Sequence, residues 1–161
     1  MSRRLLPLAL AAASLFAADG SLVERIGNTA RSLALGRYAY EQARQWAMQR
    51  KQFGRALCEF QGLQWKFADM KIMLDTAQTM VRRYAWLMEN GQAERADTAV
   101  LKYYVGESFK SISDTCLQVL GGYGYCSEYP MQRFFRDSRL ATIGGGTSEI
   151  QKNIIAATLG L

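Results

Sequence analysis

The chain has 161 residues, a net charge of +6 and no histidine, and 49% of its residues are hydrophobic. This length and apolar content suffice for one domain with a buried core, and they exclude a globally disordered chain. Without imidazole, the chain cannot carry out Ser-His-Asp hydrolysis, Cys-His nucleophilic catalysis or most zinc chemistry by itself. Any acid–base chemistry must therefore use carboxylates, lysines, tyrosines or cysteines.

The cysteines and the basic residues exclude two further classes of protein. Cys58, Cys116 and Cys126 are odd in number and form no Cys-x-x-Cys pair, so we expect neither a disulfide framework nor a structural zinc site. The basic residues are scattered, with no run longer than two, and no nucleic-acid-binding motif is present. We therefore expect no nucleic-acid partner.

The first twenty residues allow two interpretations. Arg3 and Arg4 precede an apolar run over residues 5–18, which resembles the hydrophobic region of a signal peptide. The run is too short to span a membrane comfortably, and it equally suits a short segment packed on the domain. Because the rest of the chain is typical of an intracellular protein, we expect a cytoplasmic or mitochondrial-matrix location. We treat residues 1–20 as an uncertain segment and 21–161 as one domain.

Two long helices are predicted in the first half of the chain, each from an apolar stripe at alternating steps of four and three residues. The first spans about 22–52 and ends at Phe53-Gly54. Its stripe comprises Leu22, Ile26, Thr29, Leu33, Gly36, Tyr40, Ala43 and Ala47. Gly36 indicates either a closely approaching helix or ligand, or a tolerated glycine. The second spans about 60–90 and ends at Asn90-Gly91. Its stripe comprises Leu63, Phe67, Met70, Leu74, Ala77, Val81, Tyr84 and Met88.

Two further helices are predicted in the second half. One spans about 93–120, ends at the glycines of residues 121–124, and has less regular apolar spacing. Its expected inward residues are Ala96, Val100, Tyr103 and Leu117. A loop containing Pro130 follows, and a short helix over 148–158 begins after Thr147, a suitable N-cap. Long helices with short connections predict an all-α fold, an antiparallel four-helix bundle.

Three motifs carry a family resemblance. Residues 50–54 read RKQFG, 118–125 read QVLGGYGY and 143–150 read IGGGTSEI. In this order and spacing they resemble the C-terminal helical domain of the acyl-CoA dehydrogenase family, over residues 21–161. The chemistry is compatible with this resemblance, because glycine-rich turns let the backbone approach a ligand. A helix N-terminus at Thr147 would also favour a pyrophosphate.

The resemblance implies an FAD-dependent oxidoreductase that converts an acyl-CoA thioester to a trans-2-enoyl-CoA. It implies that Thr147 and Glu149 contact the adenosine-diphosphate part of this subunit's own FAD. The residues implied to contact the FAD of a neighbouring subunit are Arg50, Phe53, Gln61, Gln118 and Gly122. The expected electron acceptor is an electron-transfer flavoprotein or a similar protein. The chain is also expected to assemble with further copies of itself, as a dimer or tetramer, or with a chain that supplies the missing N-terminal domains. We expect no membrane partner.

The catalytic base departs from the commonest pattern of the family. Many members carry a glutamate one residue before the Gly-Thr-Ser segment, where this chain has Gly145. Isovaleryl-CoA and long-chain acyl-CoA dehydrogenases instead carry it on the first bundle helix, before an arginine and twenty-six residues ahead of the Arg-x-x-Phe-Gly arginine. That position is Glu24, followed by Arg25. Glu24 is the candidate base. The alternative is that Glu24 is only a first-turn glutamate, which the helix dipole favours.

The resemblance also implies a substrate site. The backbone N–H of Gly145 would polarise the thioester carbonyl, Gly146 would lie beside the thioester and Arg25 would help to place the substrate. The absence of side chains at Gly144 and Gly145 suggests room for a branched acyl group. Because the family normally has further domains before this one, two alternatives stay open: a truncated, non-catalytic relative that acts in assembly or partner binding, and a basic helical bundle unrelated to flavin.

Overall fold

The computed structural model describes the backbone of residues 20–161 and the side chains of residues 25–161. The signal-like run and the side chain of Glu24 therefore lie outside the described residues. Within residues 20–161, no helix is both long enough and apolar enough to cross a membrane. The elements are α2 (Gly20–Gln49), β1 (Lys51–Gln52), β2 (Arg55–Ala56), η1 (Leu57–Glu59), α3 (Gln61–Glu89), α4 (Arg95–Leu120), α5 (Gly122–Tyr125), α6 (Met131–Ala141) and α7 (Ser148–Thr158).

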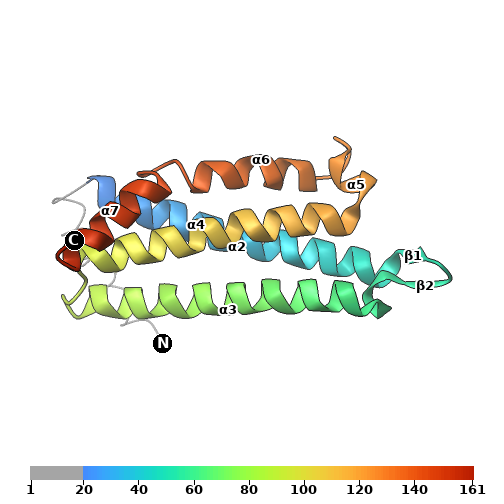
Figure 1. Ribbon diagram of the computed structural model, residues 1–161, viewed down its shortest axis with the longest axis horizontal. Helices are drawn as coiled ribbons and strands as arrows, with labels where there is room; N and C mark the ends of the chain where they lie inside the picture. Colours follow the sequence, from blue (N-terminus) through green and yellow to red (C-terminus); the bar gives the residue numbers. More distant parts are fainter. Residues whose placement is uncertain (1–19) are drawn as a thin grey trace, which may run out of the picture.

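Four of these helices form a bundle, which confirms the predicted fold class. Helices α2 and α4 run in one direction, and α3 and α6 run in the opposite direction on either side of them (Figure 1). Helix α7 lies at the end where α2 begins, and the β1–β2 hairpin and α5 lie at the other end (Figure 1). The fourth helix of the bundle is α6, whereas the sequence predicted a loop in that region and assigned the fourth helix to residues 148–158.

Small residues bring α2 against its neighbours. Ala39, Ala43 and Ala47 are fully buried. At Gly36, an added Cβ would lie 3.4 Å from Phe109 Cδ2 and 3.8 Å from Leu74 Cδ2. These are ordinary contact distances, so an alanine would fit at position 36. This agrees with the second of the two interpretations that the sequence left open, a tolerated glycine. Dense packing of this kind contributes dispersion energy along the whole contact.

Helix α3 follows its predicted stripe. Met70, Leu74, Ala77 and Tyr84 are buried, and the Tyr84 hydroxyl and Thr98 Oγ1 lie 2.6 Å apart, which ties α3 to α4. The helix ends at Glu89 with Asn90 as its C-cap, and Gly91 adopts the left-handed φ of 65° that the predicted stop requires. Because α3 lies at the side of the bundle, only one of its faces is buried, and the buried residues follow a clear helical period.

Helix α4 is where the stripe prediction was wrong. Val100, expected to point inward, is 39% exposed, whereas Leu101, Val105, Phe109 and Ile112 are buried. Helix α4 contacts α2, α3, α6 and α7, so it is covered on several sides. A helix buried on several sides needs no single apolar stripe, and its period does not reveal which side faces the core.

A hairpin between α2 and η1 was also missed. Helix α2 ends at Gln49, not at the predicted Gln52. Strands β1 and β2 then pair antiparallel, with Lys51 opposite Ala56. Phe53 and Gly54 form the two-residue turn with φ of 52° and 81°, as a type I′ turn requires at both central positions. The predicted breaker is therefore the tip of a hairpin.

Candidate functional site

The predicted site residues fall into two groups at opposite ends of the bundle (Figure 1). The glycine-triplet end contains Arg25, Gly145, Gly146, Thr147 and Glu149. The hairpin end contains Arg50, Phe53, Gln61, Gln118 and Gly122. Arg25 and Arg50 are separated by the length of α2, about 37 Å at 1.5 Å per residue. The predicted site residues of one chain therefore form two separate groups.

The glycine triplet packs directly against the start of α2. Gly145 and Gly146 have φ of 68° and 94°, a region that costs a side-chain-bearing residue steric energy. A Cβ at Gly145 would lie 3.2 Å from Asn28 Nδ2 and 3.4 Å from Arg25 Cγ. A side chain at this position would thus meet α2. The backbone of residue 24 belongs to the same turn of α2, one residue before Arg25.

Asn28 Nδ2 lies next to both Gly144 and Gly145. A Cβ at Gly144 would lie 3.4 Å from the Leu140 carbonyl oxygen and 3.5 Å from Asn28 Nδ2. The space left by the missing side chains is therefore bounded by α2, and room for a branched acyl group stays a prediction. The glycines allow α2 to approach the loop.

Three side chains from three helices hold the carbonyl groups of the triplet. Arg25 of α2, 7% exposed, donates from Nε to the Gly145 carbonyl at 3.1 Å. Lys102 of α4, 2% exposed, donates to the Gly146 carbonyl. Gln151 of α7, fully buried, donates from Nε2 to the Gly145 and Gly146 carbonyls at 3.3 and 3.1 Å. Lys102 and Gln151 were not predicted from the sequence, although a lysine among the apolar residues of a central helix was an available signal for Lys102.

The start of α7 is capped as predicted. Thr147 Oγ1 accepts a hydrogen bond from the Ile150 N–H at 3.4 Å, and Ser148 Oγ lies 2.6 Å from Glu107 Oε1 of α4, to which it donates. Hydrogen bonds from the Glu149 backbone N–H and the Thr147 hydroxyl lower the pKa of the Glu149 carboxyl below its usual 4.5. Glu149 is therefore a charged acceptor near neutral pH, suited to hydroxyl groups and unsuited to a phosphate.

The hairpin end is built on aromatic rings. The Arg50 guanidinium lies over the Tyr123 ring, 5.2 Å from its centroid. The Tyr123 ring lies 5.0 Å from the Trp46 ring and 5.3 Å from the Tyr129 ring. A guanidinium group held against an aromatic face can still direct its N–H groups past the edge of the ring, where they can bind an anion. This aromatic cluster was not predicted, and it fixes Arg50 next to the glycines of α5.

The other residues of the hairpin end are open to solvent. Phe53 is 93% exposed at the hairpin tip, and its ring lies 6.5 Å from that of Phe60. Gln61, Gln118 and Gly122 are exposed as well. A phenylalanine exposed to this extent costs hydrophobic free energy unless another molecule covers it.

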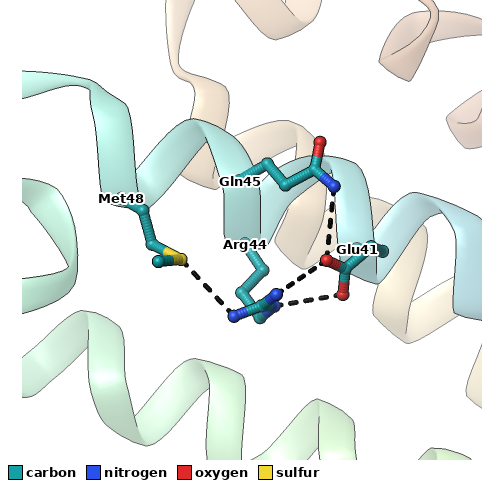
Figure 2. A network of polar contacts seen from close by, with 4 residues as sticks. All are labelled: Glu41, Arg44, Gln45 and Met48. Carbon is teal, nitrogen blue, oxygen red and sulfur yellow. Dashed lines mark hydrogen bonds and ion pairs between the residues drawn. The ribbon is translucent and has the colours of Figure 1, made fainter.

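Two other surface features lie between these ends. On the exposed side of α2, Arg44 donates two hydrogen bonds to Glu41, at 2.8 and 3.0 Å, and Gln45 donates a third at 3.3 Å (Figure 2). The bond from Arg44 lowers the pKa of Glu41, although an exposed pair of this kind adds little stability. A groove of about 500 Å³ runs beside it between α2 and α3, lined by Leu33, Tyr38 and Val81 among others. None of the predicted site residues lines this groove.

Burial makes two of the non-carboxylate groups unsuitable as bases. It raises the pKa of the Cys116 thiol in α4 to about 12, and it raises the pKa of Tyr84 above 10.0. Both groups stay protonated at neutral pH, so neither can abstract a proton there. Within residues 25–161, no cluster of three metal-ligating side chains is found.

Comparison with known proteins gives the family. Residues 16–160 match the family described as acyl-CoA dehydrogenase, C-terminal domain. The chain is 43% identical over 132 residues to benzylmalonyl-CoA dehydrogenase of Aromatoleum aromaticum, covering 82% of this chain and 35% of that protein. It is 35% identical over 137 residues to the caffeyl-CoA reductase-Etf complex subunit CarC of Acetobacterium woodii, covering 85% of this chain and 36% of that protein.

The fold comparison agrees with the sequence comparison. The butyryl-CoA dehydrogenase structure from Megasphaera elsdenii superposes with a TM-score of 0.82 at 34% identity, covering 85% of this chain and 36% of that one. The chain thus spans about a third of the length of these relatives. The chain therefore belongs to the acyl-CoA dehydrogenase family and corresponds to its C-terminal domain.

Proposed function

We propose that this chain is the C-terminal part of an FAD-dependent enzyme that dehydrogenates an acyl-CoA thioester between its α and β carbons. The observation that carries the proposal is the contact between the glycine triplet and the first turns of α2. Arg25 Nε donates to the Gly145 carbonyl at 3.1 Å, so the helix position that precedes Arg25 is next to the loop. That position is Glu24.

The residues present suit FAD at both ends of the chain. At the glycine-triplet end, the backbone N–H groups of Gly145, Gly146 and Thr147 have no backbone acceptor among residues 20–161, so they are available to oxygen atoms of a ligand. At the hairpin end, Arg50 on Tyr123 and the exposed Phe53 suit an anionic, aromatic group. When bound, FAD supplies the acceptor for the β-hydride.

The chain's own residues would handle the proton and the carbonyl group. The carboxylate of Glu24 takes the α-proton, because Gly145 has no carboxyl group and α2 occupies the space that a side chain there would need. The N–H of Gly145 donates to the thioester carbonyl oxygen and stabilises the charge that develops there. Exclusion of water beside an apolar substrate raises the pKa of the base towards neutrality.

The remaining assignments follow the two ends. Thr147 and Glu149 would contact the adenosine-diphosphate part of the FAD in their own subunit, with the Glu149 carboxylate accepting from sugar hydroxyls. Arg50, Phe53, Gln61, Gln118 and Gly122 would contact the FAD of a neighbouring subunit. Similarity to a subunit of an Etf complex supports an electron-transfer flavoprotein as the electron acceptor.

The experiment combines this chain with the N-terminal domains of a relative, supplied as a second polypeptide, and measures bound flavin and acyl-CoA-dependent reduction of an artificial acceptor. Glu24→Gln is expected to lower kcat by about 10²- to 10⁴-fold, the usual contribution of a positioned base, while bound flavin is retained. Glu89→Gln, at an exposed glutamate at the end of α3, is the control and should keep full activity.

Two results would count against the proposal in different ways. Full activity of Glu24→Gln would place the base elsewhere but leave the family chemistry intact. No flavin uptake in any combination would favour the second candidate function, a non-catalytic bundle that acts in subunit assembly or partner binding.

A further inference from the structure

We propose that Lys102 and Gln151 are positioning residues that fix the peptide planes of the glycine triplet and so aim its N–H groups away from the bundle. Neither residue belongs to the motifs that carry the family resemblance. The proposal rests on the proposed function in one respect. The purpose of the arrangement, which is to present N–H groups to a ligand, assumes that the proposed enzyme binds a ligand at this loop.

The two side chains act on the same carbonyl groups from different helices. Lys102 comes from the middle of α4 and donates to the Gly146 carbonyl. Gln151 comes from the first turn of α7 and donates to Gly145 and Gly146, at 3.3 and 3.1 Å. The Gly146 carbonyl therefore receives two donors at once, although one is enough to satisfy a buried carbonyl. The second donor constrains the direction of the carbonyl group.

Holding a carbonyl group also aims the next N–H. A trans peptide is planar, and its N–H points opposite to its C=O. The Gly145 carbonyl belongs to the peptide that carries the Gly146 N–H, and the Gly146 carbonyl to the peptide that carries the Thr147 N–H. Because Lys102 and Gln151 hold these carbonyls from inside the bundle, the N–H groups of Gly146 and Thr147 point away from both side chains.

Burial of Lys102 argues against a packing role. Its side chain is 2% exposed, and an ammonium group taken out of water loses solvation that hydrogen bonds only partly replace. The lysine contributes a charged donor aimed at the loop, which methionine cannot supply.

Gly146 and Gln151 are matched to each other. A Cβ at Gly146 would lie 2.8 Å from Gln151 Nε2, so the amide group reaches the loop only because residue 146 is a glycine. Gln151 Oε1 is buried without a hydrogen-bond partner among residues 25–161, which shows that the amide is oriented by its donor side. A leucine or methionine would avoid this unsatisfied oxygen.

The experiment uses the ¹⁵N-labelled 161-residue chain and follows the amide signals of Gly144 to Thr147 by NMR. The variants are Lys102→Met and Gln151→Met, which keep side-chain length and remove the donors. Lys110→Met is the matched control, because Lys110 lies on the same helix with a side chain that is 43% exposed. ADP is the probe for binding to the loop, and the thermal midpoint is recorded for each variant.

Both Lys102→Met and Gln151→Met are expected to shift and broaden the amide signals of Gly145, Gly146 and Thr147, while signals of α3 and the hairpin stay in place. The affinity for ADP is expected to fall by roughly tenfold to a hundredfold, the usual effect of misplacing a contact by a fraction of an ångström to an ångström. Lys110→Met should change neither the signals nor the affinity.

Unchanged triplet signals in a folded variant would overturn the proposal, and so would changes spread evenly over the whole bundle, which indicate a purely structural role. If Lys102→Met does not fold, Gln151→Met decides by the same signals. The proposed function can fail separately: if the unmodified chain does not bind ADP, the ligand assignment loses support, while the triplet signals still test the positioning role.

Discussion

Gly145 decides what can stand beside the start of α2. Its φ is 68°, and an added Cβ would lie 3.2 Å from Asn28 Nδ2, so both the backbone and the neighbouring side chain require a glycine. The sequence alone predicted only that this position lacks a carboxyl group. The close packing of α2 was not predictable, because the contact joins residues 117 positions apart, Asn28 and Gly145, and no local pattern records it.

The cost of a side chain at this position can be measured. We expect Gly145→Ala to lower the free energy of unfolding by about 1–3 kcal/mol, from left-handed backbone strain and crowding against Asn28. The control is Gly27→Ala, in the interior of α2, where an added Cβ meets nothing within 4 Å and should stabilise by up to about 1 kcal/mol. Urea unfolding of both variants measures the difference. Equal effects would mean that the loop does not rest on α2.

Whole elements were predictable where their surroundings are simple. Helix α3 has one buried face, so its stripe gave the correct bounds and the correct inward residues. Helix α4 contacts α2, α3, α5, α6 and α7, and the spacing of its apolar residues led to the wrong placement of Val100. Helix α6 was taken for a loop, because Pro130 precedes it and only Met131, Phe134, Ser138 and Ala141 are buried. Pro130 is in fact at the helix start, where proline is tolerated.

The hairpin illustrates a different limit. The sequence correctly predicted a break in regular structure at Phe53-Gly54, but it did not predict the type of turn that these two residues form. Asn-Gly is the usual signal for a two-residue hairpin turn, and phenylalanine with φ of 52° is an unusual substitute. The family resemblance predicted that Phe53 contacts a ligand in a neighbouring subunit, and an exposed ring on a strained tip is compatible with that role.

The closeness of α4 and α6 depends on a single glycine. A Cβ at Gly106 would lie 2.9 Å from the Ala141 carbonyl oxygen, a backbone atom that cannot move alone. We expect Gly106→Ala to separate the two helices and to destabilise the protein by about 1–3 kcal/mol.

Gly36→Ala is the matched control for this prediction. Its Cβ would meet Phe109 at an ordinary 3.4 Å, and the gain in helix propensity should make the change neutral or slightly stabilising. Thermal unfolding of the two variants tests the difference. A Gly106→Ala variant as stable as Gly36→Ala would show that α6 can shift along α4 at no cost.

At the scale of the whole molecule, the main fact is the separation of the two predicted groups. Antiparallel helices place the triplet and the start of α2 at one end, and the hairpin and α5 at the other (Figure 1). The spacing of motifs along the sequence did not reveal this separation; it follows from helix direction. It agrees with the division that the family resemblance implied, in which one end serves the chain's own FAD and the other serves its neighbour's.

This division predicts that two defective subunits can repair one another. In a symmetric dimer of the proposed kind, each site would combine the glycine-triplet end of one copy with the hairpin end of the other. We consider the chain with its N-terminal domains supplied. A Glu24→Gln copy would then lack the proposed base of its own site, and an Arg50→Ala copy would weaken only the site of its partner.

A heterodimer of these two variants would contain one site with both defects and one site with neither. Differently tagged copies can be co-expressed and the heterodimer purified, and we expect about half of the wild-type activity per dimer, well above either variant homodimer. The measurement needs no assumption about acyl chain length, because any substrate that the wild-type assembly accepts will serve. A heterodimer no more active than the homodimers would exclude the shared-site arrangement. It would mean that Glu24 and Arg50 of one copy act on the same site, although the length of α2 separates them.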